Sequence, residues 1–192
     1  MYKIVTSPSK ILVQKAGNVK SFDNKLKKIL SSMEETLLAT YDPIGVGLAA
    51  PQVGLPLRIF QMKPTEKSKV TSYINPVIVS TSEEEEVPHF EGRNEKTNKP
   101  ESSKNKLLEG CLSIPNIWGN VTRKKEVVLS WQDENGNNFK QTFTGFPAII
   151  IQHEVDHLNG ILFTTHVIAQ NEKLFKSHKN KEEEDEFEEI KI

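Results

Sequence analysis

The segment from Pro147 to Gly160 constrains the fold most, because it is apolar on nearly every face and yet carries ionisable side chains. Residues 148–158 read Ala-Ile-Ile-Ile-Gln-His-Glu-Val-Asp-His-Leu. Pro147 suits the first turn of a helix, and Gly160 suits the position just beyond a helix end. A helix that is apolar all round is buried, so we expect this one to lie at the centre of the protein.

Two histidines in this segment, His153 and His157, are spaced for one metal ion. Four residues on a helix place both imidazoles on one face, one turn apart. Buried imidazoles without partners are costly, and a shared metal ion would satisfy both of them. Glu154 lies between them and can contact a metal-bound water without being a ligand. For this motif alone, a buried helix with two hydrogen-bonded histidines remains the alternative.

The only cysteine, Cys111, lies in the segment Glu109-Gly-Cys-Leu-Ser113. A single cysteine excludes an intrachain disulfide framework and leaves the thiol for chemistry or packing. A thiolate would complete a three-ligand site with one open position, which is typical of a catalytic metal. A lone cysteine is more often a small buried apolar residue, but Gly110 beside it would allow a close backbone approach.

Length and charge exclude several classes of protein. The 192 residues suit one domain, 36% are hydrophobic, and the formal net charge is −1. That charge gives no general attraction to nucleic acid or to a membrane surface, and no apolar run approaches the length of a membrane span. We expect no membrane association and no sequence-specific nucleic-acid binding. Because no signal or transit peptide is visible at the start, we expect a cytoplasmic protein, bacterial rather than organellar.

Periodicity elsewhere predicts an α+β protein, a single domain of antiparallel strands around the buried central helix that carries His-Glu-Val-Asp-His. Residues 22–40 have the apolar spacing of an amphipathic helix, with Ser21 or Asp23 as N-cap. The strands are expected at residues 57–62, 73–81, 127–131 and 139–144, with the last two forming a hairpin around Asn135-Gly136.

Two polar segments are expected to lie outside the core. Residues 82–106 contain the run Glu83–Glu86 and few hydrophobic residues, which predicts a mobile loop. Residues 177–192 are strongly charged, which predicts a disordered acidic tail. The catalytic domain would then span residues 1–170.

Three segments of the chain resemble motifs of the peptide deformylases and occur in the order of that family. They are Gly45-Val-Gly-Leu-Ala-Ala-Pro-Gln52, Glu109-Gly-Cys-Leu-Ser113 and Gln152-His-Glu-Val-Asp-His-Leu158. The similarity extends over residues 1–165 apart from the polar insertions. It implies an enzyme that removes the formyl group from the N-terminal formyl-methionine of newly made proteins and releases formate. It also implies one divalent metal held by Cys111, His153 and His157, usually Fe(II), with zinc, nickel or cobalt able to replace it.

The resemblance assigns roles to further residues. A metal-bound water would be the nucleophile, with Glu154 as general base and then general acid. The side chain of Gln52 and the backbone N–H of Leu112 would stabilise negative charge on the formyl oxygen. The peptide would lie extended along the backbone, and the methionine side chain would enter an apolar pocket. The residues implied for these two functions are Val46, Gly47 and Gly110 for the backbone, and Val46, Leu112, Phe146, Ile149 and Ile150 for the pocket.

N-formyl-methionyl nascent peptides are therefore the expected partners. Some family members also dock on the ribosome through a basic C-terminal helix. The acidic segment Lys181–Ile192 should instead be repelled by ribosomal RNA, which weakens that expectation here.

Two other functions remain open from the sequence. A metallopeptidase of the HExxH type would need a third ligand downstream, and His166 is the only nearby candidate. A catalytically silent binder of peptides or metal is the other alternative. We interpret His89, His166 and His178 as solvated, because they lie in polar or loop-like segments.

Overall fold

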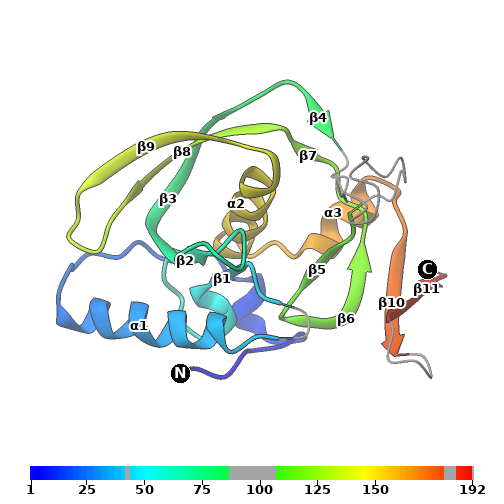
Figure 1. Cartoon of the computed structure of the whole chain (residues 1–192), viewed down its shortest axis with the longest axis horizontal. Helices are drawn as coiled ribbons and strands as arrows, with labels where there is room; N and C mark the ends of the chain where they lie inside the picture. The colour runs from blue at the N-terminus through cyan, green and yellow to red at the C-terminus, as the bar shows by residue number, and fades with distance from the viewer. Residues whose placement is uncertain (42–43, 87–106, 180–184, 192) are drawn as a thin grey trace.

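The apolar segment that was predicted to be a buried helix forms α2 (Gly145–Leu158), which lies in the middle of the computed structural model (Figure 1). The structure describes residues 1–41, 44–86, 107–179 and 185–191. Ala148, Ile151 and Leu158 of α2 have no exposed surface. The protein is a single α+β domain of antiparallel sheets around this helix, as the sequence predicted.

The larger sheet has five antiparallel strands in the order β1-β2-β3-β8-β9. Its edge strand β1 lies within the first motif, Gly45–Gln52, and packs against α2. The predicted strands and the predicted hairpin all belong to this sheet. Their bounds are β1 (Gly47–Ala49), β2 (Ile59–Met62), β3 (Thr71–Thr81), β8 (Glu126–Gln132) and β9 (Asn138–Thr144).

A second antiparallel sheet has the order β11-β10-β6-β5, so that β5 is its edge strand within the described residues. Its strands are β5 (Glu109–Cys111), β6 (Ile114–Gly119), β10 (Leu174–Lys179) and β11 (Asp185–Ile190). A short pair, β4 (Glu85–Glu86) with β7 (Arg123–Lys124), completes the strands.

The first long helix, α1 (Asn24–Leu38), is amphipathic as predicted. It begins at the predicted N-cap Asp23, whose carboxylate accepts hydrogen bonds from the N–H groups of Lys25 and Leu26. Its buried side chains pack with residues of β1, β2 and β3 in one apolar cluster. The short helices are α3 (Phe163–Ala169) and two 3₁₀ turns, Lys10–Val13 and Ala50–Val53.

The end of α2 depends on Gly160. Its φ of +73° lies in the left-handed region that favours glycine. A Cβ at this position would also lie 2.7 Å from the backbone carbonyl carbon of Val13. The start differs slightly from the prediction, because α2 begins at Gly145, two residues before Pro147. Pro147 is tolerated there because it remains in the first turn, where N–H groups have no helical partner.

The prediction of a disordered tail over residues 177–192 is wrong for the described part of that segment. Strands β10 and β11 form an antiparallel hairpin, and β10 also pairs with β6. The two strands lie side by side at one edge of the molecule (Figure 1). Composition suggested solvation, but Ser177 of this segment is buried, as is Leu174 just before it in β10. A salt bridge also joins Glu189 to Lys173, which precedes the segment.

The predicted loop over residues 82–106 lies mostly outside the described residues, as does His89. At its start, Glu85 and Glu86 form β4, and a salt bridge of 2.6 Å joins Glu85 to Lys124. None of the helices in the described residues combines the length and hydrophobicity needed to cross a bilayer.

Candidate metal centre and active site

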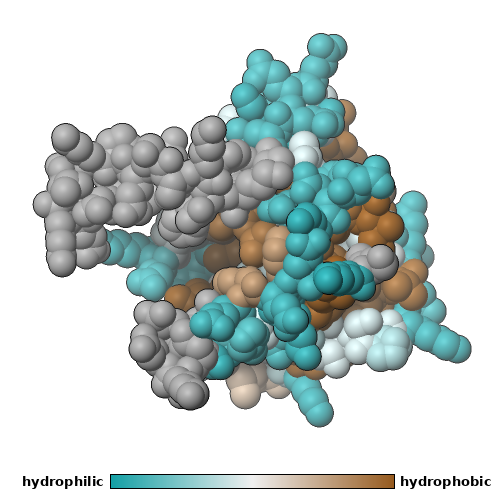
Figure 2. Space-filling view, turned by 90° about the vertical axis from the view of Figure 1, so that its right-hand side faces the viewer, coloured by the Kyte–Doolittle hydropathy of each residue, from teal (hydrophilic) through white to brown (hydrophobic). Residues whose placement is uncertain are grey.

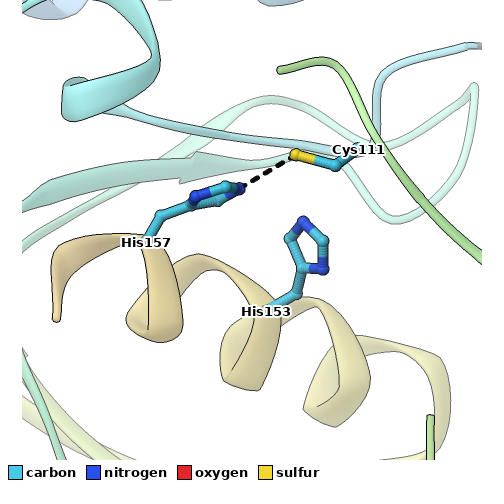
Figure 3. A group of neighbouring side chains, drawn as sticks. All are labelled: Cys111, His153 and His157. Atoms are coloured by element: carbon cyan, nitrogen blue, oxygen red, sulfur yellow. Dashed lines mark hydrogen bonds between the residues drawn. The ribbon is translucent and has the colours of Figure 1, made fainter. Parts of the chain in front are cut away.

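Cys111, His153 and His157 converge on one point, with one ligand atom from each lying within 4.8 Å of the others. The two imidazoles come from successive turns of α2 and face the thiol at the end of β5 (Figure 3). Cys111 Sγ lies 3.2 Å from His157 Nε2. The separations between the three ligand atoms are no more than about twice a metal–ligand bond of about 2.0–2.3 Å, so the three donors fit a single ion.

His157 is prepared to be a metal ligand. The residue is 1% exposed, and burial holds the pKa of its imidazole well below the usual range. The neutral ring is the form that coordinates a metal. Its Nε2 faces Cys111, whereas no described residue hydrogen-bonds its buried Nδ1.

His153 is oriented by a buried carboxylate. Its Nδ1 lies 3.0 Å from Glu109 Oε2, and a carboxylate can only accept, so Nδ1 carries the proton. Nε2 is then the ring nitrogen that remains to face a metal. Burial raises the pKa of Glu109, but the hydrogen bonds and charge of Arg123 outweigh burial and lower it to about 2. Glu109 is therefore ionised at neutral pH and fixes the tautomer of His153.

Arg123 connects this carboxylate to a second one on α2. Its guanidinium donates from Nε and Nη2 to Glu109, at 2.7 and 2.9 Å, in the bidentate arrangement that gives strong ion pairs. Nη1 donates to Asp156 Oδ2 at 2.6 Å, and His166 Nε2 lies 2.9 Å from the same oxygen. A chain of ionic hydrogen bonds thus runs from the candidate ligand His153 to the partly exposed His166.

Glu154 lies beside the ligands and is 3% exposed. Burial raises the pKa of its carboxyl to about 7. No described residue hydrogen-bonds its Oε2, so this oxygen is available to a substrate or a water. Gly47 permits this position: a Cβ there would overlap Oε1 of Glu154 and lie 2.8 Å from its Cδ.

The amide of Gln52 has a fixed direction. The backbone N–H of Ala49 donates to it at 2.8 Å, and only the amide oxygen can accept this bond. The NH₂ group therefore faces the other way, where it lies 3.5 Å from Cys111 Sγ and 3.3 Å from Ser113 Oγ. The N–H donors of this NH₂ group therefore point toward the candidate metal centre.

A cavity of about 200 Å³ opens beside the three ligands. Two edge strands flank it, with β1 from the larger sheet on one side and β5 from the second sheet on the other. Among the predicted site residues, the structure places all but His157 on its wall. These residues are Val46, Gly47, Gln52, Gly110, Cys111, Leu112, Phe146, Ile149, Ile150, His153 and Glu154.

The structure also shows where two histidines outside the predicted site, His166 and His178, lie. His166 hydrogen-bonds Asp156 and, in the described part of the chain, does not join the cluster of metal-binding side chains. His178 faces Glu186 at 3.4 Å and is half exposed, away from the centre.

The contacts of Glu109, Arg123 and Asp156, and the place of Trp118 in the cavity wall, were not predicted from the sequence. Glu109 and Asp156 lie inside two of the three motifs that resemble the family, and their place in those motifs could have identified them. Arg123 and Trp118 carry no such signal, because only the folded sheet brings them to the site.

Comparison with known proteins gives a consistent result. Residues 1–173 match the family model described as Polypeptide deformylase. The chain is 37% identical to the peptide deformylase of Borreliella burgdorferi over 84% of each chain. It is 32% identical to the peptide deformylase of Christiangramia forsetii over 91% of this chain and 85% of the relative. The crystal structure of the Thermotoga maritima peptide deformylase superposes with a TM-score of 0.72 at 34% identity, over 86% of this chain and 97% of the other.

Proposed function

Because the chain belongs to the polypeptide deformylase family, we propose that it hydrolyses the formyl group from N-terminal formyl-methionine of newly made proteins at the metal centre described above. The observation that carries this proposal is the placement of Glu154 and the Gln52 amide on the wall of an apolar cavity, beside three convergent ligand atoms. The products are formate and a peptide with a free methionine amino group.

Cys111, His153 and His157 would hold one divalent ion, and the family is metal-dependent. We propose Fe(II) as the physiological ion; zinc, nickel and cobalt use the same donor types. When bound, the ion supplies a Lewis acid that polarises the formyl carbonyl and lowers the pKa of water. Glu109 keeps the His153 ring in its ligating tautomer through the Nδ1 hydrogen bond.

Glu154 moves the proton. Its carboxylate accepts a proton from the attacking water and then delivers it to the nitrogen that leaves with the peptide. The unpartnered Oε2 faces no competing donor among the described residues, so a water can bind there. Burial keeps the surroundings dry, which strengthens each electrostatic contact made in the transition state.

Negative charge that develops on the formyl oxygen needs donors already in place. The Gln52 NH₂ group points toward Cys111, because the backbone N–H of Ala49 holds the amide oxygen on the opposite side. The backbone N–H of Leu112, next to Cys111, is the second donor of this proposal. One such donor is worth about 10²–10³ in kcat in other hydrolases.

The peptide would bind by strand addition. β1 and β5 are both edge strands, and an extended peptide between them would hydrogen-bond to the backbone of Val46, Gly47 and Gly110. The methionine side chain would enter the apolar part of the cavity. Its wall there comprises Val46, Leu112, Phe146, Ile149 and Ile150.

A Glu154→Gln variant tests the role of Glu154 directly. We expect its bound metal to equal that of the parent and its formate release to fall by about 10²–10⁴, because the amide cannot carry the proton. Metal analysis of a Cys111→Ala variant provides the complement, with an expected loss of bound metal. Unchanged formate release in Glu154→Gln, or unchanged metal content in Cys111→Ala, would contradict these assignments.

The substrate class places the activity where proteins are synthesised, and we propose the cytoplasm. For ribosome docking the structure gives little support, since β11 presents Glu186, Glu188 and Glu189 on a strand rather than basic residues on a helix. The metallopeptidase alternative loses its third ligand, because His166 hydrogen-bonds Asp156 instead.

A further inference from the structure

The hairpin β10–β11 follows the part of the chain that matches the family. The match covers residues 1–173, and β10 begins at Leu174. The hairpin nevertheless joins the sheet that carries Cys111, since β10 pairs with β6 and β6 pairs with β5. Leu174 and Ile190 pack in the same apolar cluster as Cys111. The hairpin is therefore tied to the metal centre through one sheet and one core.

Trp118 on β6 is the residue that the hairpin holds most closely. Its backbone lies opposite Phe175 of β10. Its indole Nε1–H donates to Ser177 Oγ at 3.0 Å, and its ring meets Phe187 of β11 edge to face at a centroid distance of 5.9 Å. Ser177 is buried, which fixes the acceptor. Three separate contacts thus determine where the indole lies.

The indole is at the same time a wall of the active-site cavity. Trp118 lies opposite Gly110 in the β5–β6 register, and a Cβ on Gly110 would lie 2.6 Å from the indole ring. The ring therefore rests directly over the backbone of the β5 edge, one residue before Cys111. On the face that carries the hairpin, hydrophobic surface is visible between hydrophilic segments (Figure 2).

We propose that the hairpin β10–β11 holds the Trp118 indole in position. The indole then contacts the peptide residues that follow formyl-methionine and selects among their side chains. The proposal rests on the deformylase function proposed above. Residues in an extended peptide are about 3.3 Å apart, so a peptide that leaves the metal along β5 passes Gly110 and Trp118 within one or two residues. The indole face favours apolar and aromatic side chains at those positions.

Ser177 and Phe187 are positioning residues in this arrangement, because they contact Trp118 and neither lines the cavity. Removing both should loosen the indole while leaving the metal ligands, Glu154 and Gln52 in place. The effect should appear in the KM of longer substrates rather than in the chemistry of the formyl group.

The test compares the parent chain with Ser177→Ala/Phe187→Ala on two substrates, formyl-Met-amide and formyl-Met-Phe-Phe-amide. A matched control is Phe139→Ala, because Phe139, like Phe187, is 45% exposed and has its ring in contact with a tryptophan, here Trp131, away from the active-site cavity. We expect the double variant to lose about fivefold in kcat/KM on the longer substrate through KM, the scale of a single aromatic contact, and less than about twofold on the short one. Phe139→Ala should match the parent on both.

A second readout does not depend on activity. The chain has two tryptophans, so a Trp131→Phe background leaves Trp118 as the only one. We expect acrylamide quenching of Trp118 fluorescence to increase when Ser177 and Phe187 are replaced in that background, with unchanged bound metal and far-UV circular dichroism.

Equal losses on both substrates, or no loss on either together with unchanged quenching, would overturn the role of the hairpin while the deformylase function stands. If the parent chain releases no formate from either substrate, the proposed function itself fails. These two failures are therefore distinguishable.

Discussion

Replacing Arg123 with methionine should cost about 3–5 kcal/mol in the free energy of unfolding, because it strands a buried carboxylate. Arg123 is 5% exposed and Glu109 7% exposed, and the guanidinium supplies two hydrogen bonds to Glu109. Methionine fills a similar volume but donates none. Asp156 should suffer less, since it is 17% exposed and keeps its contact with His166.

The pKa of Glu109 is consistent with that magnitude. Burial raises this pKa, and Arg123, together with His153, more than compensates and lowers it from 4.5 to about 2. At about 1.4 kcal/mol per pKa unit, this shift corresponds to about 3.5 kcal/mol. Since the pKa is lowered in the folded state, this stabilisation is present above pH 4.5 and is lost as the pH falls toward 2.

Urea unfolding of metal-free protein at pH 7 measures the cost without interference from metal binding. An Arg123→Lys control keeps the charge but loses the bidentate geometry, and should fall between the parent and Arg123→Met. A Glu109→Gln/Arg123→Met double variant should recover at least about 2 kcal/mol relative to the sum of the single changes, because no buried charge is left unpaired. A cost below about 1 kcal/mol for Arg123→Met, or strictly additive variants, would show that Arg123 does not neutralise a buried charge on Glu109.

Further predictions concern single glycines and the metal. Gly47→Ala should lower kcat/KM for formyl-Met-amide by about 100-fold with normal metal content, because its Cβ displaces the Glu154 carboxylate; activity within about threefold of the parent would contradict the contact. Gly160→Ala should lower the free energy of unfolding by at least about 2 kcal/mol in urea, because the new Cβ combines a left-handed φ with a clash against Val13. Gly145→Ala has a left-handed φ of +61° but open space around the Cβ, so it should cost only about 1 kcal/mol. Equal costs would show that the clash is relieved. Chelating the metal should lower the Tm, and reloading Fe(II) should restore it; a Tm that ignores metal would argue against ligation in the folded state.

The sequence predicted best those parts of the fold that local patterns determine. The apolar run around Ile151 predicted a buried helix, and Asp23, one of the two predicted N-cap candidates, caps α1. The hairpin around Gly136 followed from its turn residues. The metal cluster was predictable because His153 and His157 share one helix face, and because the resemblance added Cys111.

The tail was predicted wrongly because its structure depends on distant pairing. Its first residues, 177–179, are polar, but they belong to β10, which pairs with β6 from more than fifty residues earlier in the chain, and Ser177 is buried there. The same limit applies to Arg123, whose partners come from β5 and α2. Neither spacing nor composition encodes which strands become neighbours.

Product analysis with formyl-Met-Ala tests the deformylase function most directly, using protein that is stripped of metal and reloaded with Fe(II) without oxygen. We expect formate and Met-Ala in equal amounts, formed only after reloading and absent in a His153→Ala variant. Release of free alanine would indicate a metallopeptidase, and no product from folded, metal-loaded protein would indicate a silent binder; either result would exclude deformylase activity at this centre.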